Sequence, residues 1–279
     1  MVRFLRTWQG IALIIAILAA AGGGAFWWLT RPPPVVDPLV ALKQRGTIAI
    51  GARIGAAAFS ALDEHRDFVG YEPDIARALA GALGVKARLV AVDDSNALDF
   101  LRRGVVDFII LPRGLDPRDP LIRSIEPGYF ASGFNAVALR EEALKDWNDL
   151  KGQSVCGLQT SAPAKQIIEE LGGSYIGFAD RDTALQALTA ERCSAFINDE
   201  VALSDALKDD VDHRFTMAFD TIDVAPWTVA VRSADVALGD FIAKQLIEFH
   251  RTGFLIERAN TWRLQPNPFL ESLRQAYKL

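Results

Sequence analysis

The sequence contains few of the residues that build metal centres. Its 279 residues include only two cysteines and three histidines, spread along the chain. A structural zinc site needs Cys and His ligands at short, regular spacing. We therefore expect no metal and no cofactor, and we expect the three histidines to be solvated.

Several catalytic signatures are also absent. The chain has no GxGxxG or Walker loop, no GxSxG turn and no HExxH helix. These motifs place phosphate groups, a nucleophilic serine or a zinc ion. Their absence excludes an ABC ATPase subunit and a serine hydrolase, and we expect the protein not to be an enzyme.

Clusters of basic residues are missing as well. The chain has 30 Lys and Arg against 35 Asp and Glu, which gives a net charge of −5. The first 36 residues hold three Arg and no acid, so the remainder carries −8. An acidic body of this kind argues against nucleic acid as a partner.

The N-terminal segment, residues 1–36, predicts export. Arg3 and Arg6 precede an apolar run over residues 11–29, and a proline-rich spacer follows. The run is long enough to form a membrane-anchoring helix, and Ala19–Ala21 could equally end a cleaved signal peptide. Both alternatives place the body outside the cytoplasmic membrane, so we expect a periplasmic protein.

The body alternates strand and helix patterns. Predicted strands cover residues 47–51, 87–92, 105–111, 155–158, 175–178, 195–198 and 228–231. Predicted helices cover residues 71–83, 97–102, 162–171, 183–190, 237–251 and 254–263. Such alternation indicates an α/β fold with a mostly parallel sheet. Residues 97–110 and 184–199 share a helix, a basic turn and an apolar strand, which suggests two lobes of like construction.

Several motifs then resemble a known family in order along the chain. Residues 70–90, GYEPDIARALAGALGVKARLV, are similar to the signature of extracytoplasmic solute-binding proteins that serve polar amino-acid ABC transporters. Matching stretches follow at residues 104–110, 129–133, 150–155 and 198–200, and the likeness ends near Trp262. The resemblance covers about residues 39–263.

The resemblance implies a two-lobed, type II periplasmic-binding-protein fold with the ligand cleft between the lobes. Lobe I would comprise residues 39–131 plus 229–279, and lobe II residues 132–228. The chain would cross between them near residues 131–135 and 225–228. Ligands of open α/β sheets sit beyond the carboxyl ends of the strands, which agrees with this placement.

The implied function is capture of a small polar ligand, an amino acid or related carboxylate, for an ABC permease. The lobes would close over the ligand about the hinge, and we expect a monomer. Two alternatives stay open. One is a membrane-anchored sensor or accessory protein of the same fold, and the other is an enzyme similar to cyclohexadienyl dehydratases.

Two predicted ligand residues follow strands. Asp199 comes directly after the strand at residues 195–198, where the family places an acid that accepts the ligand's ammonium group. Arg53 follows the first strand, as in glutamate- and aspartate-binding members, and a guanidinium offers a bidentate fork to a carboxylate. With cationic groups in lobe I, we expect acidic or neutral ligands.

The loop after the strand at residues 105–111 departs from the family pattern. It reads LPRGLDPRDP, with Pro112 where a hydroxyl is usual and Asp119 at the position of the carboxylate-binding arginine. Arg113 or Arg118 could supply that charge instead, with Gly114 beside them.

Two further features belong to lobe II. Thr160 and Ser161 open the helix at residues 162–171, where they could cap the helix or help to bind an anion. Cys156 and Cys193 begin two strands that the implied fold makes adjacent. In an oxidising compartment, as in some family members, the pair would form a disulfide.

Overall fold

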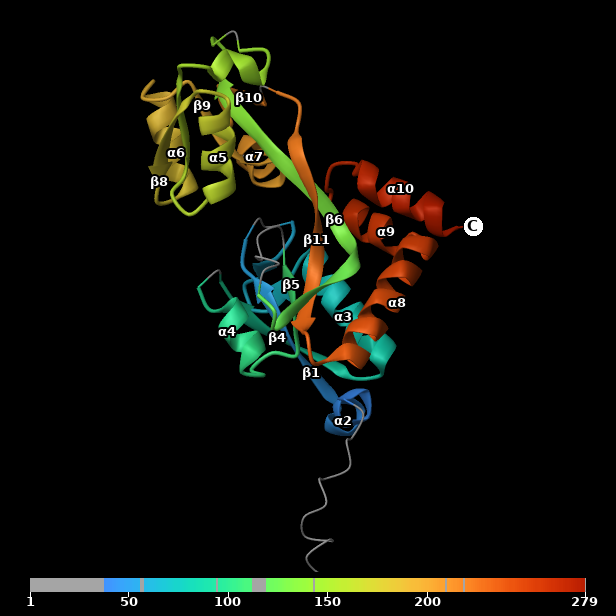
Figure 1. Cartoon of the computed structure of the whole chain (residues 1–279). Coiled ribbons are helices and arrows are strands. Elements are labelled where there is room, and N and C mark those ends of the chain that lie inside the picture. Colours follow the sequence, from blue (N-terminus) through green and yellow to red (C-terminus); the bar gives the residue numbers. More distant parts are fainter. Residues whose placement is uncertain are drawn as a thin grey trace, which may run out of the picture. The chain divides into compact units, whose positions relative to one another are not determined.

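The computed structural model describes residues 38–55, 58–93, 95–111, 119–142, 144–208, 210–217 and 219–278 (Figure 1). Within these ranges no helix is both long and apolar enough to cross a membrane. The predicted signal or anchor segment and its spacer, residues 1–36, lie outside the described residues.

The first part of the chain alternates helices and strands as the sequence predicts. Its elements are α2 (Pro38–Arg45), β1 (Thr47–Arg53), β2 (Ala61–Leu62), β3 (Phe68–Val69), α3 (Tyr71–Leu83), β4 (Lys86–Val92), α4 (Ala97–Arg102) and β5 (Phe108–Leu111). The strand predicted over residues 105–111 begins three residues later than expected. The three residues before β5 form a turn, in which Val105 and Val106 donate backbone hydrogen bonds to the carbonyl of Phe100.

Glycines set both ends of α3. Gly70 precedes the helix with φ 130°, and a Cβ there would lie 2.4 Å from the carbonyl oxygen of Phe59. Gly84 ends the helix in the left-handed conformation, with φ 79°. Only glycine adopts both conformations without strain, so these two residues fix the length of the helix.

A long strand, β6 (Ile122–Leu139), leads into the second part. The elements that follow are η1 (Trp147–Leu150), β7 (Ser154–Leu158), α5 (Ala162–Glu170), β8 (Ser174–Phe178), α6 (Arg181–Thr189), β9 (Ala195–Asp199), α7 (Glu200–Lys208) and β10 (Phe215–Met217). The chain returns through β11 (Ile222–Arg232) and ends in α8 (Val236–Thr252), α9 (Phe254–Thr261) and α10 (Pro268–Tyr277).

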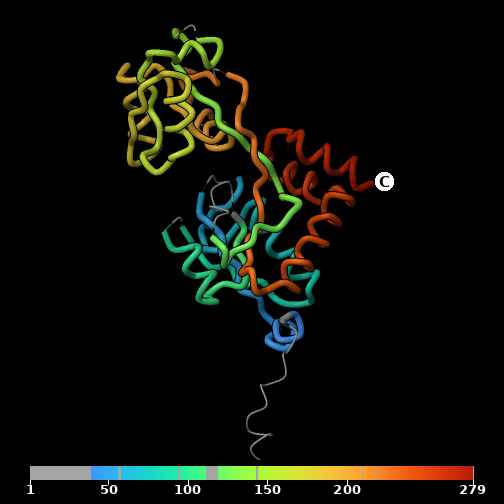
Figure 2. Tube along the Cα trace, viewed as in Figure 1, coloured from blue at the N-terminus to red at the C-terminus, as the bar shows by residue number. Residues whose placement is uncertain are grey.

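The strands other than β2 and β3 form one mixed sheet within the described part of the chain. Its order is β4-β1-β5-β11-β6-β9-β7-β8, with β10 paired to β6. Pairing is parallel between β1 and both of its neighbours, and between β7 and both of its neighbours. Strands β6 and β11 are antiparallel to each other and run side by side in Figure 2. The two predicted crossings between the lobes, near residues 131–135 and 225–228, fall within β6 and β11.

Buried side chains divide the body into two lobes. In lobe I the alternation of strand residues places Phe108 and Ile110 in one hydrophobic cluster and Ile109 in another. In lobe II the same alternation places Ala136 and Val137 of β6 in separate clusters. The lobes are defined here by these clusters, and the boundaries at residues 131/132 and 228/229 stay predictions. Residues Pro38–Leu279 form one compact unit that contains the whole sheet and all four clusters, so the unit has what it needs to fold alone.

The predicted disulfide is present in lobe II. Cys156 lies in β7 and Cys193 just before β9, and these strands pair in parallel. Both residues are buried, with Cα atoms 5.7 Å apart. The bond closes a loop over β8 and α6, and the chain-entropy model gives such a loop about 3–4 kcal/mol of stabilisation.

One histidine differs from expectation. His250 of α8 is not solvated but buried, with 1% of its surface exposed, and its Nε2 lies 2.7 Å from the carbonyl oxygen of Gly128. Burial lowers the pKa of His250, so the ring is neutral at physiological pH. The sequence around His250 shows helical spacing, but nothing local identifies the backbone carbonyl that the ring contacts.

A buried carboxyl ties α3 to the start of the crossing strand. Glu72 is 2% exposed, and the Tyr129 hydroxyl of β6 donates to its Oε1 at 2.6 Å. The Tyr71 hydroxyl donates to the Tyr129 carbonyl oxygen at 2.8 Å. Burial raises the pKa of Glu72 to about 7, although the Tyr129 hydrogen bond and the charge of Arg53 act in the opposite direction. This network anchors β6 to lobe I.

The raised pKa predicts a pH-dependent stability. Between the ordinary pKa of 4.5 and about 7, the native state binds more protons at Glu72 than the unfolded state. The free energy of unfolding therefore falls as pH rises through this window, by about 3 kcal/mol at most. Glu72→Gln keeps the oxygen that accepts from Tyr129 and cannot ionise. We expect this variant to gain stability over the parent at pH 8 and to lose that advantage at pH 4.

Urea unfolding of both proteins at the two pH values measures the difference. Glu142→Gln, at an exposed carboxyl on the turn after β6, is the matched control and should track the parent. A Glu72→Gln advantage that is the same at pH 4 and pH 8 would contradict the buried-acid account.

Candidate functional site

Asp199 ends β9, where the sequence analysis places the ammonium-binding acid. Its Oδ1 accepts a hydrogen bond from the Ser132 hydroxyl at 2.8 Å and from the Val201 backbone N–H at 2.9 Å. The Val201 N–H belongs to the first turn of α7, whose free N–H groups favour a carboxylate. The acid is therefore oriented from two sides, by the helix that follows it and by the crossing strand β6.

Ser132 binds the candidate ligand acid, and the sequence analysis did not single it out. It lies in β6 opposite Ala225 of β11 and is 3% exposed. Ser132 falls within residues 129–133, which matched the family pattern without indicating a role for this side chain. The pairing of β6 with β9, which aligns Phe134 with Asp199, brings the hydroxyl to the acid.

Arg53 is the last residue of β1 and lies opposite Val92 at the end of β4. The pKa of Asp93, which follows β4, is lowered mainly by hydrogen bonds from Ser95, and the charge of Arg53 adds to this effect. The same charge partly opposes the rise that burial causes in the pKa of Glu72. Arg53 thus lies at the carboxyl edge of the lobe I strands, within electrostatic range of two acids.

The loop with Arg113, Gly114 and Arg118 lies outside the described residues. The neighbouring Asp119, at the position where the resemblance places an arginine, accepts from Arg102 Nε at 3.0 Å. Asp119 thus pairs with an arginine of α4.

Thr160 and Ser161 lie between β7 and α5. Ser161 occupies the N-cap position, but its side chain makes no capping hydrogen bond. Its backbone N–H donates to the Leu158 carbonyl oxygen. Thr160 is exposed. The capping alternative is therefore not seen, and an anion-binding role stays a prediction.

Among the described residues, no group of three or more His, Cys, Asp or Glu side chains is placed to hold a metal ion. Among the described residues at carboxyl ends of strands are an acid in lobe II, Asp199, and an arginine in lobe I, Arg53. Their chemistry suits a ligand with an ammonium and a carboxylate.

Comparison with known proteins identifies the family of the chain. Residues 48–265 match the model of the bacterial extracellular solute-binding proteins, family 3. The lysine/arginine/ornithine-binding periplasmic protein of Escherichia coli K12 is 26% identical over 217 residues, which cover 74% of this chain and 84% of the relative. The glutamate/aspartate import solute-binding protein of Salmonella typhimurium LT2 is 24% identical over 177 residues, 58% of each chain.

A solved structure shows the same fold. The ancestral amino acid-binding protein AncCDT-1, described as a precursor of cyclohexadienyl dehydratase, superposes with a TM-score of 0.67 at 21% identity. The match covers 80% of this chain and 98% of that one. With the family model spanning both lobes and their crossing strands, the chain belongs to the bacterial extracellular solute-binding proteins, family 3, and has their two-lobed, type II periplasmic-binding-protein fold.

Proposed function

We propose that the protein captures an acidic or neutral amino acid, or a related small carboxylate, in the periplasm and delivers it to an ABC permease. The observation that carries the proposal is the orientation of the Asp199 carboxylate by Ser132 and by Val201 N–H. A carboxylate only accepts hydrogen bonds and forms strong, charge-assisted ones with an ammonium group, so an acid oriented in this way suits that partner.

The proposed mechanism is closure of the lobes over the ligand. Ser132 belongs to the crossing strand β6, so the acid that receives the ammonium contacts the element about which closure would occur. A ligand carboxylate would bind to the cationic groups of lobe I, Arg53 with Arg113 or Arg118. Thr160 and Ser161 of lobe II would supply further donors.

The charge of Arg53 supports a preference among ligands. The two relatives are named for ligands of opposite charge, lysine, arginine and ornithine in one and glutamate and aspartate in the other. Family membership therefore leaves the charge preference open. A basic side chain beside Arg53 in a closed cleft would leave two like charges together in a desolvated site, which is costly. An acidic or amide side chain avoids that repulsion.

Ligand charge is the first test. We expect residues 38–279 to bind glutamate or glutamine at least about tenfold more tightly than arginine, a difference of about 1.4 kcal/mol in binding free energy. Calorimetric titration with the three amino acids under one set of buffer conditions measures the difference. If arginine binds tightest, Arg53 does not act on the ligand and the charge argument fails.

The second test removes the charge of Asp199. Asp199→Asn keeps an oxygen for Ser132 and Val201 N–H but cannot pair with an ammonium. We expect it to weaken binding of the preferred amino acid by about 2 kcal/mol or more, as for loss of a buried charge partner. Asp220→Asn, at an exposed acid of lobe II, is the control and should bind like the parent. Equal affinities in the two variants would remove Asp199 from the site.

A further inference from the structure

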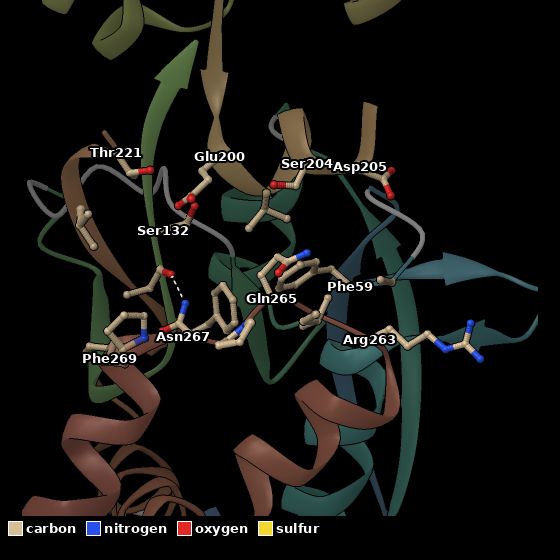
Figure 3. A pocket seen from close by; sticks show the side chains of 18 of the residues that line it. Phe59, Ser132, Glu200, Ser204, Asp205, Thr221, Arg263, Gln265, Asn267 and Phe269 are labelled. Atoms are coloured by element: carbon tan, nitrogen blue, oxygen red, sulfur yellow. Dashed lines mark hydrogen bonds between the residues drawn. The ribbon is translucent and has the colours of Figure 1, made fainter. Parts of the chain in front are cut away.

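A cavity of about 440 Å³ lies beside the crossing strands, outside the predicted ligand site. Its walls come from α7, from Phe59, from β6 at Phe130–Ser132 and from residues 263–269, which lead into α10 (Figure 3). None of the predicted ligand residues lines it, but Ser132 and Val201, which bind Asp199, do. Cavities of this volume are typical of small-molecule sites.

Part of the cavity wall lies beyond the family match. The family model ends at residue 265, whereas Pro266, Asn267, Pro268 and Phe269 line the cavity. The Asn267 side-chain amide donates to the Ala131 carbonyl oxygen at 2.8 Å, which holds this segment against β6. The cavity thus depends on a segment that the family model does not include.

Three aromatic side chains contribute to the wall. Phe59 and Phe130 are buried, with ring centroids 5.0 Å apart, and Phe269 lines the same cavity. Val201, Val224 and Leu264 add aliphatic surface. An occupant therefore needs an apolar body that can pack against aromatic rings.

The charged side chains of the wall are two acids, Glu200 and Asp205, and two bases, Lys208 and Arg263. Glu200 points from the first turn of α7 into the cavity in Figure 3, and its side chain makes no hydrogen bond or ion pair with any described residue. The other acid in the wall, Asp205, has cations near it, Lys208 at 3.8 Å and Arg181 at 3.9 Å. Arg263 also lines the cavity, but it is exposed and points away from the other labelled side chains. Glu200 thus leaves a negative charge beside an apolar wall.

A second acceptor lies in the same wall. The Asn267 Oδ1 is buried and has no hydrogen-bond partner in the structure. A buried acceptor without a donor is destabilising, so a donor on an occupant would relieve this cost. Acceptors of this kind and aromatic rings both favour a cation over an anion.

We propose that this cavity is a second binding site, for a small amine with an aromatic or bulky apolar body. The ammonium group pairs with the Glu200 carboxylate, and the apolar body packs against Phe59, Phe130 and Phe269. Asn267 Oδ1 accepts a further hydrogen bond from the ligand. The site adjoins the one proposed for amino acids, since Ser132 and Val201 line the cavity and also bind Asp199, but it uses neither Asp199 nor Arg53.

A matched pair of probes tests the proposal. Residues 38–279 are titrated with 2-phenylethylamine and with 3-phenylpropionate, which carry the same ring and opposite charges. Calorimetry gives the affinity, and amide NMR shifts give the location. We expect the amine to bind at least about tenfold more tightly than the acid and to shift signals of α7 and of residues 263–269. No binding of the amine, equal binding of both probes, or shifts centred on Asp199 and Arg53 would overturn the proposal.

Variants identify the groups that act. Glu200→Gln should weaken 2-phenylethylamine binding about tenfold, whereas Glu141→Gln, at an exposed acid, should leave it unchanged. Phe269→Ala should weaken binding of both probes and provides a second readout if Glu200→Gln unfolds. Asp199→Asn should leave amine binding unchanged, which separates this site from the amino-acid site. Amine affinity that is unaffected by both Glu200→Gln and Phe269→Ala would refute the assignment.

Discussion

The antiparallel pairing of β6 with β11 is the constraint on which the rest of the structure depends. The two strands pair from Ile222 opposite Phe134 to Arg232 opposite Ile122. Strand β11 also pairs with β5 in lobe I, and β6 also pairs with β9 in lobe II. Close approach of the strands requires glycine at position 133, because a Cβ there would lie 2.4 Å from the Ile222 carbonyl oxygen. The pairing shifts register between Ile222 and Ala225 and between Trp227 and Val229. The first irregularity follows Ile222, which packs against a lobe II cluster, and the second lies between two residues of a lobe I cluster.

One strand of this pair, β6, also contacts both acids that the account depends on, Glu72 and Asp199. Strand β6 meets lobe I at Tyr129, which binds the buried Glu72, and it meets lobe II at Ser132, which binds Asp199. Tyr129 and Ser132 are three positions apart in β6. The strand therefore contacts the buried Glu72 and the candidate ligand acid Asp199 at nearby positions. In the proposed mechanism, a ligand bound to Asp199 lies next to the crossing strand β6. Ligand binding therefore needs no long path of coupled residues to affect the hinge.

Local sequence patterns predicted much of the fold. Helix α4 has the predicted ends, and α3 stops at Gly84 as expected, because capping and helical spacing are local signals. Strand β6 was predicted only at its crossing, since its nearly continuous burial has no alternation to read. The family resemblance correctly predicted the disulfide. Asp199 lies at the end of β9, and its role as a ligand residue stays a prediction. The roles of Ser132, Glu72 and Asn267 depend on partners distant in the sequence, and no local pattern identifies such partners.

The central claim is that a ligand bound at Asp199 closes the two lobes about β6 and β11. Small-angle X-ray scattering of residues 38–279, with and without a saturating amount of the amino acid that binds tightest, tests this claim most directly. The account predicts that the radius of gyration falls when the ligand is added, and that Asp199→Asn at the same ligand concentration shows no such fall. A radius of gyration that stays constant while calorimetry shows the parent protein saturated would contradict the account.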